Sequence, residues 1–198
     1  MDKEFNMMMV GLRAHDLVKI AQIFAQAAIK EGKKIVGTDH TFVSMEQMVE
    51  MSHIRVGEEV FSPLIPKGMC DLLIGFLIGE GARVAAEFLK SSGVAIFNTR
   101  DIVPLIVMPP HSTYPEPKEI LDLFSPLPER LITIDAYSLA RETGDKFTVN
   151  FVMLGAASSS GALPVTSQSL MDSIKELVPE RELEVSLKAF ELGQGSVS

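Results

Sequence analysis

The sequence predicts a three-layer α/β/α sandwich with a mainly parallel sheet and a hairpin extension. Short apolar runs bounded by glycine or proline alternate with longer segments whose apolar residues recur every three or four positions. The 198 residues are enough for one sizeable core, and no internal repeat or long linker divides them. We therefore expect a single domain over residues 1–193 and a frayed tail at 194–198.

The N-terminal segment predicts a strand, a helix and a second strand. An apolar run at 5–10 stops at Gly11, and Asp16 is a suitable cap for a helix that ends at Gly32. A short strand is then expected at 33–37. Because a crossover helix connects parallel strands, these two strands are predicted to form a parallel pair with a right-handed connection.

The hairpin extension is expected just after this unit. Residues 41–49 have no clear period, whereas 52–61 predicts a hairpin that turns at Gly57-Glu58. His53 alternates with apolar residues there, so its side chain is expected to face solvent.

The rest of the chain continues the alternation of strands and helices. The expected strands are 70–76, 93–97 and 131–134. The expected helices are 79–90, 137–143, 150–157, 167–177 and 180–190. Prolines from Pro104 to Pro117 predict a loop or covering segment.

The charge balance argues against two classes of partner. The net charge is −8 and the pI is near 5.0, whereas binding to nucleic acid or to an anionic membrane needs a basic surface. The N-terminus has no signal-peptide pattern, and the apolar runs are too short to cross a bilayer. We expect a cytoplasmic protein that binds neither nucleic acid nor membrane.

Metal chemistry has little support in the sequence. One cysteine, Cys70, cannot hold an iron–sulfur cluster alone, and its apolar neighbours predict a core residue. The four histidines lack metal-ligand spacing. Among eleven methionines, Met45, Met48 and Met51 would share one side of a helix, where they serve either the core or a partner surface.

The first strand-to-helix turn is the leading candidate for a ligand site. It reads Gly11-Leu12-Arg13-Ala14-His15-Asp16, at the sheet edge where phosphates bind in doubly wound folds. Only Gly11 remains for close backbone approach, while Arg13 and His15 are candidate side-chain partners for an anion. An anion site and a plain connection both stay open.

A second candidate lies at Ser158-Ser159-Ser160-Gly161, after the helix expected at 150–157. Small residues at a helix end can form a nest of amides for an anion. The alternative is a flexible helix exit toward Pro164. No nucleophile elbow surrounds these serines, so no catalytic residue is predicted.

Several motifs in order resemble the gamma-type subunit of 2-oxoacid:ferredoxin oxidoreductases, including the beta subunit of indolepyruvate oxidoreductase, which is built on the same domain. The resemblance covers about nine-tenths of the chain in order and spacing. The matching stretches are 27–32, 52–65, 71–75, Asn98-Thr99, Tyr114-Pro115, Asp135-Ala136, Leu139-Ala140, Gly144, Asn150, 153–156 and 188–193.

The resemblance implies a single gamma-type domain within a heteromeric enzyme that oxidises a 2-oxoacid such as pyruvate or indolepyruvate. Its implied partners are catalytic subunits that carry thiamine diphosphate, iron–sulfur clusters and, in some members, coenzyme A, with no cofactor on this chain. A free-standing binding or regulatory domain, monomeric or homodimeric in isolation, is the alternative.

Three departures separate this chain from the family pattern. The family's Gly-x-Gly-Gly-Gln-Gly turn aligns with residues 11–16, and its Arg-Gly-Gly motif aligns with Glu46-Gln47-Met48. Ser186 replaces an asparagine near the closing signature. We therefore do not carry the family's ligand functions onto these positions.

Overall fold

A six-stranded mixed sheet forms the middle layer of the molecule. The computed structural model describes residues 4–44, 47–100 and 115–197. The strands are β1 (Phe5–Leu12), β2 (Ile35–Ser44), β3 (Gln47–Val56), β4 (Cys70–Gly75), β5 (Leu89–Asn98) and β6 (Arg130–Ile134). Their order is β2-β3-β1-β4-β5-β6. Four of them, β1, β4, β5 and β6, pair in parallel, and β3 is antiparallel to both its neighbours.

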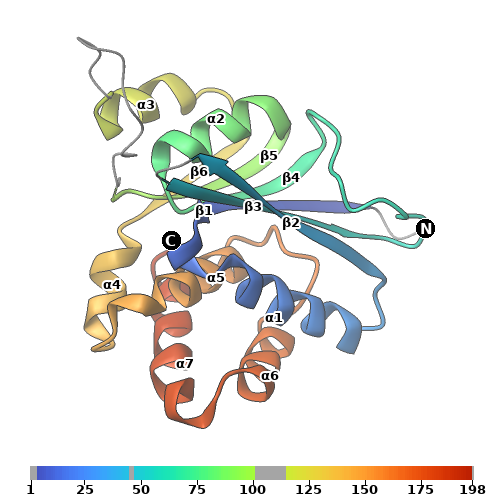
Figure 1. Cartoon of the computed structure of the whole chain (residues 1–198), viewed down its shortest axis with the longest axis vertical. Coiled ribbons are helices and arrows are strands. Elements are labelled where there is room, and N and C mark those ends of the chain that lie inside the picture. The colour runs from blue at the N-terminus through green and yellow to red at the C-terminus, as the bar shows by residue number, and fades with distance from the viewer. Residues whose placement is uncertain (1–3, 45–46, 101–114, 198) are drawn as a thin grey trace.

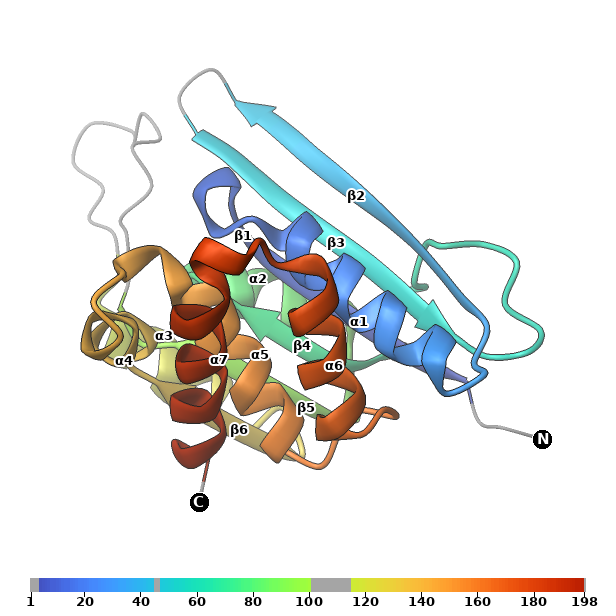
Figure 2. The same cartoon turned by 90° about the horizontal axis from the view of Figure 1, so that it is seen from below.

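Helices cover both faces of this sheet, which confirms the predicted three-layer architecture (Figure 1). The helices are α1 (Leu17–Lys30), α2 (Ile78–Phe88), α3 (Pro117–Phe124), α4 (Ala136–Glu142), α5 (Val149–Ser159), α6 (Ser167–Leu177) and α7 (Glu180–Gly195). One face carries α1, α5, α6 and α7, and the other carries α2 and α3. Figure 2 shows β2 and β3 as a ribbon that extends past these helices.

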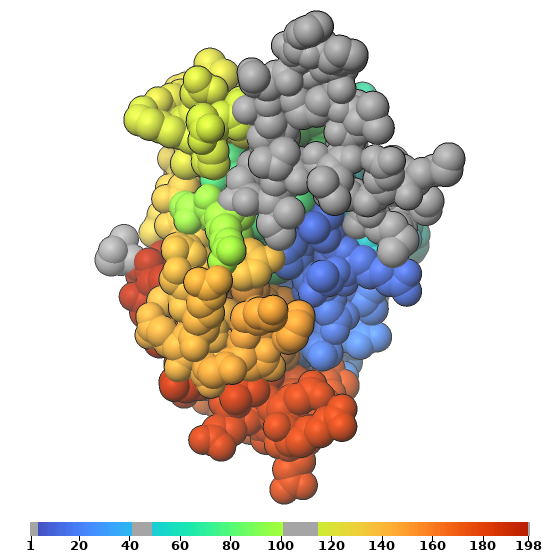
Figure 3. Space-filling view, turned by 60° about the vertical axis from the view of Figure 1, so that its left-hand side comes forward, coloured from blue at the N-terminus to red at the C-terminus, as the bar shows by residue number. Residues whose placement is uncertain are grey.

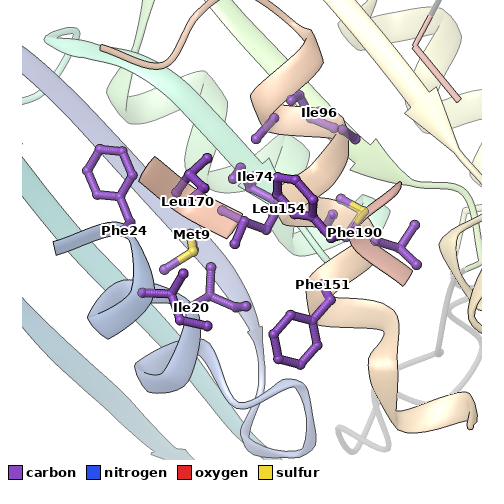
Figure 4. Close-up of a cluster of buried hydrophobic side chains, with 14 of the residues drawn as sticks. Met9, Ile20, Phe24, Ile74, Ile96, Phe151, Leu154, Leu170 and Phe190 are labelled. Atoms are coloured by element: carbon purple, nitrogen blue, oxygen red, sulfur yellow. The ribbon is translucent and has the colours of Figure 1, made fainter. Parts of the chain in front are cut away.

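The central strand β1 contributes to two cores at once. Met7 and Met9 point toward α1 and α5, while Met8 and Val10 point toward α2, and all four are fully buried. Figure 4 shows the larger cluster, in which side chains from the sheet, such as Met9, meet side chains from α1, α5, α6 and α7. A strand buried on both faces needs an unbroken apolar run, as 5–10 provides.

Helices α5 and α7 touch through their backbones. A Cβ built on Gly155 would lie 2.0 Å from the Phe190 carbonyl oxygen, and one built on Gly193 would lie 2.0 Å from that of Val152. Only glycine allows so close an approach, so these two positions set the crossing of the helices. The contact explains why the two C-terminal motifs of the resemblance both contain glycine.

The predicted parallel pair of the first two strands is wrong. Strand β3 lies between β1 and β2, so that His53 pairs with Met8 on one side and with Thr38 on the other. The connection through α1 leads to the edge of the sheet, and the chain then returns beside β1. Strand neighbours depend on non-local packing, which a local apolar pattern does not report.

The hairpin also differs from its prediction. Its arms are β2 and β3, and Gly57 follows the hairpin instead of turning it. Met48 and Met51 are therefore strand residues, not neighbours on one side of a helix. Met51 is buried in the core, and Met45 lies outside the described residues.

His53 is buried, so the prediction that it faces solvent is wrong. Its Nδ1 accepts a hydrogen bond from the Ile65 amide at 3.2 Å, which ties the irregular segment after β3 to the sheet. Burial, followed by the nearby His40, lowers the pKa of His53. The His53 ring lies 5.8 Å from the ring of Phe88 on α2, between centroids, and α1 also contacts the strand, so His53 does not face solvent.

The remaining elements lie close to their predicted positions, with two differences. Helix α3, with Pro117 in its first turn, was expected as loop, and the prolines at 104–110 lie outside the described residues. Helix α7 continues to Gly195, beyond the predicted domain end. Cys70 is buried as expected, and burial raises the pKa of its thiol to about 12. In the described part of the chain, no helix is long and apolar enough to span a membrane.

Candidate functional site

The first turn is closed by a side chain. After β1, a short 3₁₀ helix (Arg13–His15) carries the imidazole of His15 back over Gly11, where a Cβ would lie 2.8 Å from the His15 Nδ1. This nitrogen accepts a hydrogen bond from the Leu12 amide at 2.9 Å. The imidazole therefore occupies the concave side of the turn, where a main-chain cradle would hold its anion.

The other polar groups of the turn also make their hydrogen bonds within the protein. The Asp16 amide donates to the Arg13 carbonyl at 3.1 Å, and the Asp16 carboxylate caps α1 by accepting from the Lys19 amide. Asp16 has a φ of 50°, so it adopts a left-handed conformation that glycine adopts more readily than other residues. A carboxylate at this position repels an anion at the helix start.

His15 is held in one neutral tautomer. Because Nδ1 accepts from Leu12, the ring proton resides on Nε2, which donates to the Tyr137 hydroxyl at 2.8 Å. The ring also stacks on Phe76 with centroids 4.8 Å apart. Burial lowers the pKa of His15 to about 4, since a charged imidazole would lose its hydration there.

A cavity of about 280 Å³ opens beside this turn. Its lining comes from the turn after β1, the residue after Thr99 beyond β5, helix α4 and the short turn that leads into α5: Ala14, His15, Arg100, Tyr137, Arg141, Lys146, Phe147 and Val149. Figure 3 shows this edge of the molecule, with the orange residues of α4 and the following turn beside the blue N-terminal turn. The cavity lies where ligands bind in open α/β sheets.

The cavity has a cationic lining. Arg100, Arg141 and Lys146 surround it, and none of the described residues that line it is acidic. The Arg100 guanidinium lies over the Tyr137 ring, 5.2 Å from its centre. Within the described ranges, none of the three cations makes an ion pair.

Asn98, at the end of β5, positions two sides of the cavity. Its side-chain amide donates to the carbonyl oxygens of Phe76 and Arg100, at 3.1 and 2.9 Å. Its side-chain oxygen accepts from the Ala136 amide at 3.1 Å, which places the start of α4 and the adjacent Tyr137. This buried amide thus connects three strand ends and is the structural basis of the Asn98-Thr99 motif.

The second predicted site lies at the opposite edge of the sheet. Ser158 and Ser159 form the last turn of α5, and the Ser160 carbonyl accepts from Arg130 at the start of β6. A helix C-terminus presents carbonyl groups, not the amides that an anion needs. Gly161 has a φ of 74° and reverses the chain. The two predicted sites are therefore not brought together.

Sequence reasoning missed the cationic residues of the cavity. Arg100 follows β5, while Tyr137 and Arg141 are one helical turn apart after β6. The rule that ligands collect at the carboxyl ends of parallel strands would have grouped them once three strand ends were aligned. Arg13, predicted from the same turn, does not line the cavity. No group of three metal-ligating side chains occurs in the parts of the chain that the structure describes.

Comparison with solved structures supports the fold. The keto/oxoacid ferredoxin oxidoreductase gamma subunit from Geobacter sulfurreducens superposes with a TM-score of 0.73 at 19% identity, covering 98% of this chain and 96% of that one. The pyruvate oxidoreductase subunit PORC from Thermotoga maritima gives 0.74 at 17% identity, covering 100% and 98%. The 2-oxoglutarate:ferredoxin oxidoreductase from Magnetococcus marinus gives 0.72 at 16% identity, with 98% of this chain matching 31% of that chain.

Sequence comparison reaches the family. The indolepyruvate oxidoreductase subunit IorB of Thermococcus kodakarensis is 30% identical over 195 residues, covering 96% of this chain and 95% of the relative. The subunit IorB of Pyrococcus horikoshii is 30% identical over 193 residues, with the same coverage. The family model for pyruvate ferredoxin/flavodoxin oxidoreductase matches residues 6–195. This chain therefore belongs to the pyruvate ferredoxin/flavodoxin oxidoreductase family, as a member with the gamma-type domain.

Proposed function

We propose that this chain is a non-catalytic gamma-type subunit of a heteromeric 2-oxoacid:ferredoxin oxidoreductase of the cytoplasm. The observation that carries the proposal is the match of nearly the whole chain to nearly the whole length of the IorB subunits. The partners would be catalytic subunits that bind thiamine diphosphate and iron–sulfur clusters. The names of these relatives favour indolepyruvate over pyruvate as the 2-oxoacid.

The chemistry of the chain is consistent with a division of labour between subunits. An iron–sulfur cluster needs several thiolates, whereas the single Cys70 is buried and its pKa is raised. The imidazole of His15 is engaged on both nitrogens and is neutral at physiological pH. Neither group is available for covalent or acid–base chemistry on a bound substrate.

The test is purification of the complex under native, anaerobic conditions. Tagged chain should recover a partner that binds thiamine diphosphate, identified by mass spectrometry. The eluate should reduce a viologen dye when a 2-oxoacid and coenzyme A are supplied, with indolepyruvate, pyruvate and 2-oxoglutarate compared in parallel. The chain purified alone should reduce no dye. Recovery of the chain without any partner would contradict the proposal.

A free-standing binding domain is the second candidate, and the cationic cavity is the observation that favours it. Such a domain would be a monomer or homodimer that binds a ligand with no partner present. Light scattering during the same purification separates the candidates, because only the subunit would elute at the mass of a heteromer.

A further inference from the structure

We propose that the free edge of β2 binds an extended segment of another protein as an added strand, with an apolar and a basic side chain entering the groove between β2 and α1. The segment would run antiparallel to β2, and its basic residue would lie opposite Asp39. This surface shares no lining residue with the cationic cavity, and the inference is independent of the proposed function.

Strand β2 is a long edge strand that lacks the usual protection against pairing. It is the outermost strand of the sheet and has 10 residues (Figure 2). It contains no proline or lysine, and its register with β3 continues from Ile35 to Ser44 without a bulge. Prolines, lysines and bulges are common protection for such edges, because an exposed row of N–H and C=O groups pairs readily with another chain. Strand β2 therefore offers a regular template for one more strand.

Part of the backbone of β2 has no hydrogen-bond partner. In an antiparallel pair, every second residue points its N–H and C=O away from the neighbouring strand. For residues 35–40, these outward groups make no hydrogen bond with any residue that the structure describes. An added strand would satisfy them, and main-chain bonds of this kind give strand addition its affinity.

A groove lies beside this edge, on the face of the ribbon that α1 covers. Its volume is about 260 Å³, and Val18, Ala21 and Ala25 of α1 form its apolar wall. Gly37 shares this face with its pair partner Ile54 and has no side chain to fill the space. An added strand alternates its side chains between the two faces, so the residue opposite Gly37 would enter the groove. A large aliphatic side chain suits this position because it would cover Val18, which is 41% exposed.

Asp39 gives the groove a negative charge. The described part of the lining contains no lysine or arginine, and Asp39 makes no ion pair within the described ranges. The buried Ser52 hydroxyl donates to the Asp39 carboxylate and so orients it. Because directly opposite residues of adjacent strands share a face, a lysine or arginine in the added strand would reach this carboxylate.

A second copy of this chain is a poorer occupant of the edge. Strand β2 has no lysine or arginine to place opposite Asp39, and each copy would bring a net charge of −8. Like charges oppose such self-pairing. The charge of the edge therefore favours a basic segment of a different protein.

The test is an NMR titration of the isotope-labelled full chain with the acetylated and amidated peptide Thr-Lys-Thr-Leu-Thr-Val-Thr. In the antiparallel register its lysine lies opposite Asp39 and its leucine opposite Gly37. We expect saturable shifts of the backbone amides of β2 and of the α1 residues that line the groove. Replacing the peptide's lysine by glutamate should weaken binding about tenfold, and so should replacing its leucine by alanine.

Two peptides that are N-methylated at alternate residues separate strand addition from binding by side chains alone. Only one set of alternate amides faces β2, so one of these peptides should lose binding and the other should keep it. Equal affinities of the two peptides would overturn the proposed strand pairing.

The variant Asp39→Asn tests the charge, because its amide oxygen is still able to accept from Ser52. It should remove the preference for the lysine peptide over the glutamate peptide. The matched control is Asp122→Asn, which changes the net charge by the same amount. Asp122 lies on α3, on the other face of the sheet, where it pairs with Lys118. The preference should persist in this control, and melting temperatures would confirm that both variants are folded.

Three results of the titration would overturn the proposal: a lack of saturable binding, shifts confined to another surface, or an equal loss of preference in Asp122→Asn. Light scattering provides one more outcome. A dimer that Asp39→Asn strengthens would show that a second copy occupies the edge, and this result would also overturn the proposal.

Discussion

At the scale of single residues, His15 determines the character of the first turn. Its two nitrogens connect the Leu12 amide to the Tyr137 hydroxyl, and its ring lies on Phe76. One side chain therefore fills the space of a cradle, orients the wall of a cavity and joins β1 to α4. None of these roles follows from the composition of the turn, in which a histidine beside an arginine suggests an exposed anion partner.

The buried imidazole makes stability depend on pH. The pKa of His15 is about 4 in the fold against an ordinary 6.5, so the unfolded chain binds the additional proton between these values. Stability is unaffected above pH 6.5, falls as the pH drops below it, and has lost about 3 kcal/mol at pH 4. Denaturant unfolding between pH 7 and 4 measures this loss.

The variant His15→Asn isolates the contribution of the imidazole, because its amide oxygen is still able to accept from Leu12 but does not titrate. The remaining titrating groups, His53 among them, are common to both proteins. The curve of the variant should fall less steeply over this interval. Parallel curves for the two proteins would contradict the neutral assignment of His15.

The Ser158 hydroxyl is expected to lower the stability of the fold. Its Oγ is buried and has no hydrogen-bond partner in the described structure. Ser158→Ala removes this unpaired group from the last turn of α5 and should raise the free energy of unfolding by about 1 kcal/mol. Thermal or urea unfolding provides the measurement.

Ser160→Ala is the contrasting change two residues later. The Ser160 hydroxyl donates to the Ala157 carbonyl at 2.7 Å and accepts from the Ala162 amide at 3.2 Å. Its removal should lower stability by about 1 kcal/mol. A loss of stability in Ser158→Ala as large as that in Ser160→Ala would mean that the Ser158 hydroxyl has a partner after all.

At the scale of elements, the crossing of α5 and α7 depends on two glycines. Gly155→Ala or Gly193→Ala would place a methyl group 2.0 Å from a carbonyl oxygen of the facing helix, so the helices must separate. We expect each change to cost about 3 kcal/mol or more, since displacing α7 opens the core around Phe190. Urea unfolding, with far-UV circular dichroism to confirm helix content, measures the cost.

Gly195→Ala is the matched control on the same helix. A Cβ at this position meets no atom within 4 Å. Alanine favours a helix over glycine, so this variant should be as stable as the parent or slightly more stable. Similar losses at positions 193 and 195 would show that helix propensity, and not the close approach, accounts for the effect.

The helices could be predicted from the sequence, whereas the order of the strands could not. Helix α1 was predicted with its cap at Asp16 and its end at Gly32 because capping and amphipathic period are local properties. The position of β3 between β1 and β2 was not predicted. Strand β3 is buried on both faces, so its sequence lacks the alternation of a solvent-facing hairpin. Local signals therefore identified the elements but not their neighbours.

The residues of the candidate site were harder still to predict from local sequence signals. The sequence directed attention to the first turn, and the structure does place a cavity there. However, Arg100 lies far from Tyr137 and Lys146 in the chain. Only the parallel order of β1, β4, β5 and β6 brings them to one edge. Charges that converge through tertiary structure leave no contiguous motif.

At the scale of the whole molecule, the two edges of the sheet have different chemical characters. The carboxyl edge holds the cavity and its three cations, and the amino edge holds the C-terminus of α5 with Ser160 bonded to Arg130. Although the protein is acidic overall, the cavity at the carboxyl edge gathers three cations, and it lies away from the C-terminus of α5. In a heteromeric enzyme, this difference between the two edges would mean that the carboxyl edge of the domain faces an anionic ligand.

The burial of α5 has a consequence for how the chain is made. Residues Val149 to Ala157 are buried on every side, and α7, near the end of the chain, supplies much of their cover. During synthesis the apolar helix α5 leaves the ribosome before α7, the segment that covers it. Until Gly193 emerges, the nascent chain exposes an apolar surface of the kind that chaperones bind.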